Sequence, residues 1–375
     1  MTFFLHLIEN LFPAFTPPVA TSSFRKILVV DLNFLGDMLM SSPVYRALKE
    51  RIPDARIDVL GLHIAAPALK ANPFIDELHL INDTNPASLL RSAGSLRKQT
   101  YDLVLQLNTS LKTNILLWVV GRRYRLGYNY AHRGCFNNIR IPLETRTARV
   151  GNRIDECVGL LEKAFGWHIA DRSMVFSVPA EAEDRMRLAL SQEGIAGEAL
   201  LIGMHTNCRQ DREQRRWSRE KFVDLANRLI DTHAAIILLT GGPEDRAYVE
   251  EIARAIRPGA PVRNLAGKLS LMEFAALLRR LAVFVTINTG PMHIAVALRT
   301  PTVAIIGGTP ASVVFPLNCP LFQSMMDPAL EQWDPAELHP SYTPAIQNIR
   351  VDQVLEKIQL LLTSREVRPT GPRPS

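Results

Sequence analysis

The 375-residue sequence has few cysteines and lacks several motifs that would place it in a common enzyme class. No CxxC pair occurs among its four cysteines, so we expect neither a disulfide framework nor a zinc site, and a reducing cytoplasm is the simpler setting. No GxGxxG follows a predicted strand, and neither a P-loop nor a GxSxG motif is present. No DxD pair and no HExxH motif requires a metal, so we expect no cofactor.

Long apolar runs are also absent. The apolar residues 1–15 are interrupted by Glu9 and Asn10 and have no basic segment before them, so they make a poor signal peptide and are too short to span a bilayer. Two interpretations of residues 1–24 stay open: a helix packed on its own protein, or a helix that binds a membrane surface or a partner.

The composition is that of a globular protein. Apolar residues make up 47% and charged residues 21%, which excludes a mainly disordered, collagen-like or coiled-coil chain. The length predicts two domains or one very large domain. The net charge of +6 suits an anionic partner without identifying it.

Short β-branched runs alternate with helical patterns in both halves of the chain, which predicts an α/β fold with doubly wound parallel sheets. We expect an apolar extension (1–24), two doubly wound domains (25–178 and 179–345), a final amphipathic helix (346–363) and a disordered tail (364–375). The predicted strands are 26–32, 57–61, 77–83, 101–108, 200–205, 234–242, 282–288 and 302–308. Ligands of such sheets bind at the carboxyl ends of the strands, so the segments that follow these strands are the candidate sites.

The first candidate is the turn Asn33–Asp37, which follows the first strand and opens a helix. Gly36 allows a close backbone approach to a ligand. Asp37 has two interpretations: a helix N-cap, or a carboxylate that acts as a general base toward a substrate.

The second candidate is Asn288–His293, after the strand 282–288. Thr289 and Gly290 open a helix, and Pro291 suits its first turn. The N–H groups and the dipole at such a helix start favour an anion such as a phosphate. His293 is either a structural histidine or a ligand of that phosphate.

The third candidate is the basic loop 205–217, which contains Arg209, Arg212, Arg215 and Arg216 and is soon followed by Lys221. It is either a solvated face or a diphosphate site, for which arginine forks are suited. Glu244, after the strand 234–242, either accepts hydrogen bonds from ribose hydroxyls or caps the next helix.

Positive charge gathers in one stretch of the first half. Residues 112–149 contain eight basic residues and one acidic residue, Glu144, a net charge of +7. Such a patch attracts a polyanion, and no nucleic-acid module is evident, so a phosphorylated lipid or sugar fits as well. The basic residues are Lys112, Arg122, Arg123, Arg125, Arg133, Arg140, Arg146 and Arg149.

Together these segments resemble glycosyltransferase family 9, the ADP-heptose:lipopolysaccharide heptosyltransferases. The resemblance extends over most of residues 26–310 and depends most on the LGD (35–37) and TGPMH (289–293) segments. It implies a GT-B fold, in which two Rossmann-like domains face a cleft and the last helix (346–363) packs back toward the first domain. It also implies an inverting, metal-independent transfer of heptose from ADP-heptose, or a similar nucleotide sugar, to a sugar hydroxyl of the lipopolysaccharide inner core. A cytoplasmic location in peripheral contact with the inner membrane follows, and no nucleic acid is a partner.

The resemblance also assigns roles to residues. Asp37 matches the general base, and the first domain takes the anionic acceptor. The acceptor-binding candidates are Gly36, Lys112, Arg122 and Arg125. The second domain takes the nucleotide sugar and stabilises the ADP leaving group. The donor-binding candidates are Arg215, Arg216, Glu244, Asn288, Thr289, Gly290 and His293.

Two positions depart from the family pattern. Asn288 stands where the family usually has Asp, and Asn152 where it often has His. Transfer from another nucleotide sugar and a non-catalytic GT-B scaffold that binds a glycolipid or a partner therefore stay open. A nucleotide-sugar epimerase also shares the fold, but the basic patch argues against a small soluble substrate.

Overall fold

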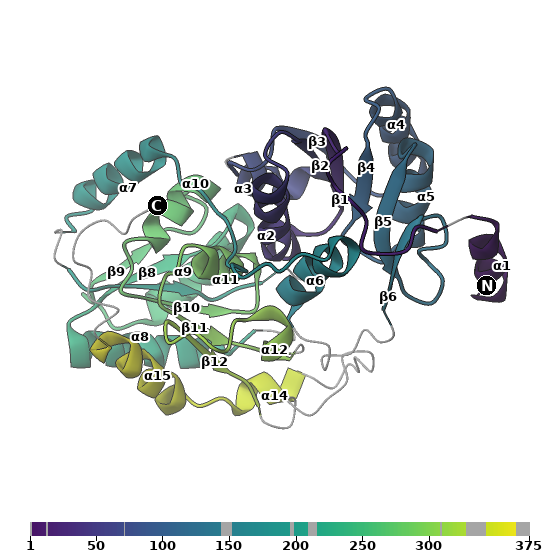
Figure 1. The fold of residues 1–375 in the computed structure, drawn as a ribbon. Helices are drawn as coiled ribbons and strands as arrows, with labels where there is room; N and C mark the ends of the chain where they lie inside the picture. Colours follow the sequence, from purple (N-terminus) through teal and green to yellow (C-terminus); the bar gives the residue numbers. More distant parts are fainter. Residues whose placement is uncertain are drawn as a thin grey trace. The chain divides into compact units, whose positions relative to one another are not determined.

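Two parallel β-sheets organise the chain, one in each half of the sequence (Figure 1). The computed structural model describes residues 2–12, 14–70, 72–143, 152–195, 199–208, 216–307, 310–327 and 343–364. The chain divides into two units, Met1–Phe176 and Ser177–Ser375, close to the predicted boundary after residue 178. The predicted α/β class with two Rossmann-like sheets is confirmed.

The first sheet has six parallel strands in the order β3-β2-β1-β4-β5-β6. A fully buried parallel strand needs apolar side chains on both faces. Ile27 and Val29 of β1 enter one core with α2 and α6, while Leu28 and Val30 enter the other with α4 and α5. The strands are β1 (Lys26–Asp31), β2 (Arg56–Leu62), β3 (Glu77–Ile81), β4 (Leu103–Gln106), β5 (Tyr124–Asn129) and β6 (Ile139–Pro142).

Helices cover both faces of this sheet. α2 (Leu35–Arg51) packs against α6 (Arg153–Phe165), and α4 (Pro86–Arg97) packs against α5 (Leu111–Val120). The remaining helices of this unit are α1 (Thr2–Leu11), η1 (His63–Ala65) and α3 (Ala66–Lys70).

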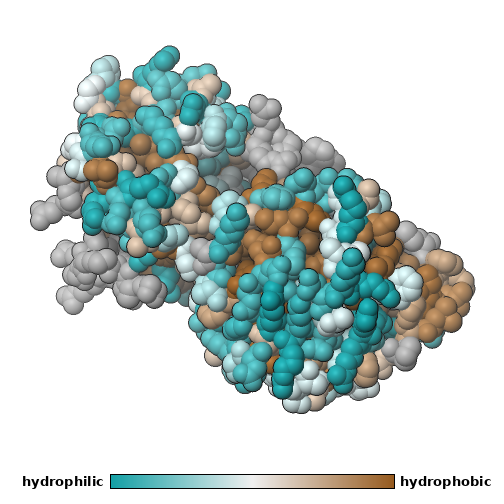
Figure 2. Space-filling model, turned by 90° about the horizontal axis from the view of Figure 1, so that it is seen from above, coloured by the Kyte–Doolittle hydropathy of each residue, from teal (hydrophilic) through white to brown (hydrophobic). Residues whose placement is uncertain are grey.

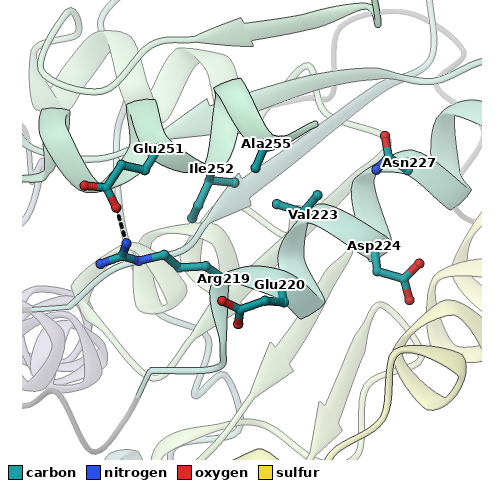
Figure 3. A pocket seen from close by; sticks show the side chains of 8 residues that line it. All are labelled: Arg219, Glu220, Val223, Asp224, Asn227, Glu251, Ile252 and Ala255. Carbon is teal, nitrogen blue, oxygen red and sulfur yellow. Dashed lines mark hydrogen bonds and ion pairs between the residues drawn. The ribbon is translucent and has the colours of Figure 1, made fainter. Parts of the chain in front are cut away.

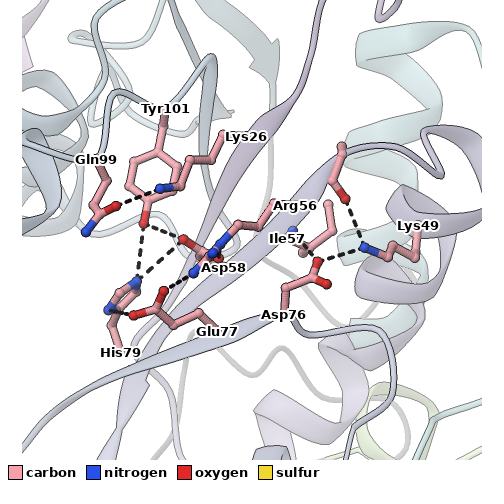
Figure 4. A network of polar contacts seen from close by, with 11 residues as sticks. Lys26, Lys49, Arg56, Ile57, Asp58, Asp76, Glu77, His79, Gln99 and Tyr101 are labelled. Atoms are coloured by element: carbon pink, nitrogen blue, oxygen red, sulfur yellow. Dashed lines mark hydrogen bonds and ion pairs between the residues drawn. The ribbon is translucent and has the colours of Figure 1, made fainter.

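A network of polar side chains ties together the amino ends of β1, β2 and β3 (Figure 4). The fully buried carboxylate of Asp58 accepts a hydrogen bond from the Tyr101 hydroxyl at 2.8 Å and pairs with Arg56 Nε at 2.8 Å. Burial by itself would raise the pKa of Asp58, but the hydrogen bonds from His79, Arg56 and Tyr101 outweigh burial and lower it. These ionisable groups therefore satisfy one another at the end of the sheet opposite to the candidate residues.

The second sheet repeats the same topology. Its order, β12-β11-β10-β7-β8-β9, is that of the first sheet when the strands are numbered within the unit. The strands are β7 (Leu201–His205), β8 (Ile236–Thr240), β9 (Val262–Asn264), β10 (Val283–Ile287), β11 (Thr302–Ile305) and β12 (Phe322–Met325). The helices are α7 (Ala180–Gln192), α8 (Arg219–His233), η4 (Pro243–Asp245), α9 (Arg246–Ala255), α10 (Leu271–Leu278), α11 (Gly290–Ala297), α12 (Ala311–Val314), α14 (Thr343–Asn348) and α15 (Val351–Thr363).

The last helix, α15, packs on α8 and on strands of the second sheet. Its buried side chains, Val351, Val354, Ile358 and Leu361, belong to the core of the second unit. The expectation that it packs back toward the first domain stays a prediction. The predicted disordered tail lies, apart from Ser364, outside the described residues. Within the described ranges, no helix combines the length and the apolar character that crossing a membrane would need.

Candidate functional site

Both sheets reverse their strand order at one place, between β1 and β4 in the first unit and between β7 and β10 in the second. Loops on either side of such a point run in opposite directions and leave a crevice at the carboxyl ends of the strands. The segments 33–37 and 288–293 follow β1 and β10, so each sheet carries one candidate segment at its switch point.

Asp37 is the third residue of α2, and the N-cap of that helix is Phe34, which makes no side-chain cap hydrogen bond. The N-cap interpretation of Asp37 is therefore wrong. The carboxylate is only partly buried and lies in the first helical turn, where the helix dipole favours negative charge. This placement leaves the interpretation as a base open.

Arg153, at the start of α6, is a charged residue of this site that sequence reasoning missed. Its guanidinium donates to the backbone carbonyl of Leu107, at the end of β4, and pairs with Glu156. Burial would lower the pKa of Arg153, but Cys157, Glu156, Asp31 and Asp37 outweigh burial and raise it. The positive charge of Arg153 is therefore stabilised in part by the negative charge of Asp37. The only signal in the sequence was its place beside Asn152, which caps α6 through a hydrogen bond from the Ile154 N–H at 3.0 Å.

Asp31, the last residue of β1, is a second charged group that the sequence did not single out. Its carboxylate is fully buried. It accepts hydrogen bonds from Asn33 Nδ2 at 2.6 Å and from the Tyr45 hydroxyl at 3.2 Å. A buried carboxylate is tolerated only where donors surround it. The hydrogen bond from Asn33 to Asp31 therefore holds the turn that leads to Asp37.

A cavity of about 490 Å³ opens at the same strand ends in the first unit. The hydroxyl of Thr109 is buried there without a hydrogen-bond partner, which is unusual in a folded protein, and a ligand hydroxyl would satisfy it. Lys112 belongs to the lining, whereas Gly36, Arg122 and Arg125 do not. The lining residues are Leu32, Asn33, Thr84, Asn108, Thr109, Ser110, Leu111, Lys112, Thr113 and Arg133.

Arg125, a predicted acceptor residue, is tied to the backbone of its own unit. Its Nε donates to the Phe136 carbonyl at 2.7 Å and its Nη1 to the Gly121 carbonyl at 3.1 Å. Burial and the nearby Arg140 lower the pKa of Arg125. Arg125 therefore holds the backbone of two loops of its own unit. Arg122, between α5 and β5, is exposed.

In the second unit, α11 begins at Gly290, with Thr289 as its N-cap and Pro291 in its first turn. Asn288, directly after β10, is buried. The Thr289 side chain makes no cap hydrogen bond to the helix, and its hydroxyl donates to the Ile287 carbonyl at 3.3 Å. This end of α11 therefore has the backbone features of an anion site.

His293 is buried in the first turn of α11, and its Nδ1 has no hydrogen-bond partner. Burial lowers its pKa to about 4, so the imidazole is neutral near pH 7. His205, at the end of β7, is buried in the same way, and its pKa is also lowered to about 4. A neutral His293 can donate or accept a hydrogen bond but brings no charge to a phosphate.

Glu244 is exposed, while its neighbour Asp245 is buried and organises the loop after β8. Asp245 accepts hydrogen bonds from the Gly242 N–H and from Asn207 Nδ2, both at 2.7 Å. The sequence analysis selected Glu244 and missed Asp245. Two adjacent carboxylates look alike in the sequence, and only the fold shows that Asp245 is the one that accepts hydrogen bonds. Glu244 still presents its carboxylate at the carboxyl end of β8.

The basic loop is described only at its end. Arg209, Arg212 and Arg215 lie outside the described residues, while the Arg216 guanidinium lies 5.0 Å from the centre of the Tyr248 ring. Lys221 instead donates to the carbonyls of Gln347 and Ile349, the latter at 3.1 Å, so it is tied to the protein rather than available to a phosphate.

A second cavity, of about 500 Å³, lies between α8 and α9 (Figure 3). Its walls are helix side chains, and an ion pair between Arg219 and Glu251 spans it. None of its lining residues follows a strand end, so it lies apart from the candidate segments. Two groups of residues in the described ranges place three metal-ligating atoms within 4.8 Å of one another: His6, Glu9 and His132, and Asp58, Glu77 and His79. Neither group includes a candidate residue.

The comparison with known families decides between the classes of protein that share this fold. The sequence model described as "Glycosyltransferase family 9 (heptosyltransferase)" matches residues 89–325, more than half of the chain. The chain belongs to glycosyltransferase family 9. The resemblance in the sequence is thereby confirmed, and the protein is a glycosyltransferase.

Relatives of this family 9 protein extend over nearly the whole chain. It is 29% identical over 344 residues to lipopolysaccharide heptosyltransferase 3 of Escherichia coli, covering 86% of this chain and 97% of that protein. It is 26% identical to lipopolysaccharide heptosyltransferase 2 of Escherichia coli strain K12, covering 91% and 99%. The solved structure of the E. coli ADP-heptose lps heptosyltransferase II has the same fold, with a TM-score of 0.74, 24% identity and coverage of 91% and 99%. Asp37 lies outside the range that the family model matches, so its role stays a prediction.

Proposed function

We propose that this family 9 protein transfers a heptose from ADP-heptose to a sugar hydroxyl of the lipopolysaccharide inner core, with inversion and without a metal. The observation that carries the proposal is the pair of switch points: an acidic helix start after β1 and an anion-binding helix start after β10. The names of the relatives support heptose, lipopolysaccharide and ADP-heptose as the chemical classes.

On the acceptor side, Asp37 takes the proton from the attacking hydroxyl. Direct attack with one displacement inverts the anomeric carbon. Gly36 keeps the backbone beside it open, and the ammonium of Lys112 faces the phosphates or acidic sugars of the acceptor from the cavity after β4. Arg122 adds positive charge nearby in sequence, and Arg125 acts through the loops that it holds.

On the donor side, the leaving group is ADP, and its diphosphate gains charge as the glycosidic bond breaks. Arg215 and Arg216 and the first turn of α11, from Thr289 and Gly290, supply the stabilising donors in place of a metal. His293 contributes a hydrogen bond from a neutral imidazole. The carboxylate of Glu244 accepts hydrogen bonds from the ribose hydroxyls.

Asn288 favours one alternative, transfer from a different nucleotide sugar. The family usually has Asp at this position, and an amide keeps the hydrogen bonds but loses the charge that holds the sugar or the nucleotide. Thermal-shift measurements with ADP, UDP, GDP and CMP discriminate the two functions. We expect ADP to stabilise the protein most, and a preference for another nucleotide would replace ADP-heptose as the donor.

The transfer itself is tested with ADP-heptose and a lipopolysaccharide core acceptor in the presence of EDTA. We expect Asp37→Asn to lose activity by about 10²-fold or more, the usual effect of removing a general base, while ADP binding stays normal. Asp54→Asn, which alters an exposed carboxylate after α2, is the matched control. Full activity of Asp37→Asn would mean that another group is the base, and loss of activity in EDTA would refute metal independence. We place the reaction in the cytoplasm, at the inner face of the membrane that carries the acceptor.

A further inference from the structure

The helix α1 (Thr2–Leu11) has apolar side chains on the side that faces the protein and also on the side that faces solvent. Leu5 is buried, and Ile8 is half-buried. The outer side carries large apolar residues: Phe3 is 83% exposed, Phe4 63%, Leu7 55% and Leu11 73%. Large apolar side chains that are exposed together mark a surface at which a partner or a membrane binds.

Polar contacts hold α1 in this orientation. Glu9 accepts a hydrogen bond from Asn129 Nδ2 at 2.8 Å, and its other carboxylate oxygen lies 2.7 Å from His132 Nδ1. Arg140 Nη1 lies 3.9 Å from Glu9 Oε1. Burial would raise the pKa of Glu9, but these partners outweigh burial and lower it. Glu9 is therefore used inward, and the exposed part of α1 consists of its apolar residues together with His6 and Asn10.

The segment that follows α1 contacts α5 through aromatic rings. Phe12, directly after α1, lies 6.4 Å from Trp118 between ring centres. On α5, Lys112, Ile115 and Trp118 recur every three residues and are all exposed, so they share one side of the helix. We call Phe3, Phe4, Leu7, Leu11, Ile115 and Trp118 the α1 surface. Figure 2 shows hydrophobic residues gathered on the side of the first unit where Figure 1 draws α1.

The segment that carries α5 has charged side chains of one sign. Residues 111–143 contain six basic residues and no acidic one. Lys112, Arg122 and Arg123 are exposed, whereas Arg140 is turned inward to Glu9. Basic side chains around an apolar and aromatic surface match a bilayer with anionic headgroups, because the rings enter the interface while the cations meet the phosphates.

We propose that the α1 surface binds an anionic lipid bilayer, with α1 lying in the plane of the interface. Ten residues of helix span about 15 Å, half the hydrocarbon thickness, so α1 rests on the membrane rather than crossing it. The proposal rests on the proposed function only in one respect: it locates the contact with the membrane that carries the acceptor. Lipid binding can be measured without measuring transfer.

The test is vesicle flotation of the full chain with phosphatidylcholine vesicles that contain about 30% phosphatidylglycerol. We expect the wild type to float. The variant Phe4→Gln/Leu7→Gln/Leu11→Gln keeps Glu9 and good helix formers, and we expect its partition to fall by about tenfold or more. Pure phosphatidylcholine, or about 0.5 M salt, should weaken binding of the wild type without abolishing it.

The matched control is Leu188→Gln/Leu317→Gln/Leu360→Gln, which removes three exposed leucines of the second unit. We expect it to float as the wild type does. In a separate readout, lipids brominated near the headgroup should quench part of the tryptophan fluorescence, and Trp118→Phe should remove that part. Circular dichroism and the melting temperature establish that each variant is folded.

Equal flotation of the wild type and the α1 variant would overturn the proposal. The proposal would also be overturned if the wild type did not float and was a dimer, while the α1 variant was a monomer. A second copy of the chain, rather than a membrane, would then cover the α1 surface. If the protein bound lipid but transferred no heptose, the proposed function would be refuted, and the proposal for the α1 surface would still hold.

Discussion

Replacing His293 should remove a defined part of the acid sensitivity of folding. The imidazole is 5% exposed, its Nδ1 has no partner, and burial lowers its pKa to about 4. In the unfolded chain a histidine titrates near about 6.5. The unfolded state therefore takes up the proton first as the pH falls. The stability that depends on a neutral His293 is present above about pH 6.5 and is lost progressively toward pH 4.

The magnitude follows from the difference between the two pKa values. Each unit is worth about 1.4 kcal/mol, so the full effect is about 3 kcal/mol, of which about 2 kcal/mol is lost by about pH 5. That is a large share of the total stability of an ordinary domain. His205 is buried in the same unit with its pKa lowered in the same direction, so the wild-type dependence contains both contributions.

The assay is urea unfolding of the wild type and His293→Gln at a series of pH values from about 7.5 to 4.5. Gln is similar in length and does not titrate, so its own cost is the same at every pH, and the comparison depends on the slopes. We expect the free energy of unfolding of the variant to fall by about 2 kcal/mol less than that of the wild type by about pH 5. His233→Gln, which alters a partly exposed residue at the end of α8, serves as the control for exchanging a histidine for a glutamine elsewhere in the same unit.

Parallel slopes for wild type and His293→Gln would refute the reasoning, because the histidine would then be as easily protonated in the fold as in the unfolded chain. The same reasoning has a functional consequence. A neutral imidazole adds no charge to the diphosphate site, so the pH dependence of ADP affinity between about pH 6 and 8 should be the same in both proteins.

Three further outcomes are expected. Arg216→Ala should weaken ADP binding by about tenfold in calorimetry through loss of one charge-assisted contact, and unchanged affinity would move the diphosphate elsewhere. Lys112→Ala should raise the KM for the acceptor and leave that for the donor unchanged; equal acceptor saturation would make the cavity after β4 incidental. Arg125→Ala should lower the melting temperature, because two backbone carbonyls lose their donor at a cost of about 1–3 kcal/mol, and an unchanged melting temperature would contradict that role.

The strands at the centre of each sheet were predictable because they are buried on both faces. The run Lys26–Leu32 predicts β1, and the runs over 200–205 and 282–288 predict β7 and β10. Four outer strands were missed: β6, β9 and β12 lie at sheet edges and β5 lies next to an edge, and none of them forms a continuous buried run. Their polar positions resemble loops in the sequence, and only pairing with a neighbouring strand makes them regular.

The positions of the candidate segments were also predictable, since a loop that follows a buried parallel strand lies at the carboxyl end of the sheet. Asp37 and the Thr289–His293 turn could be located in this way. The partners of individual side chains could not. Arg153 lies more than 100 residues from Asp37 in the sequence, and no local pattern connects them.

By itself, the sequence determined the two α/β halves, the family and the loops that carry the candidate chemistry, because burial and helix starts leave local patterns in the chain. The tertiary structure decided which charged groups are already used within the protein. Arg125 and Lys221 hold backbone carbonyls, Asp245 rather than Glu244 orders its loop, and the charge of α1 is turned inward. Whether a polar atom is available to a ligand depends on donors and acceptors brought together from distant parts of the chain, and that information exists only once the chain has folded.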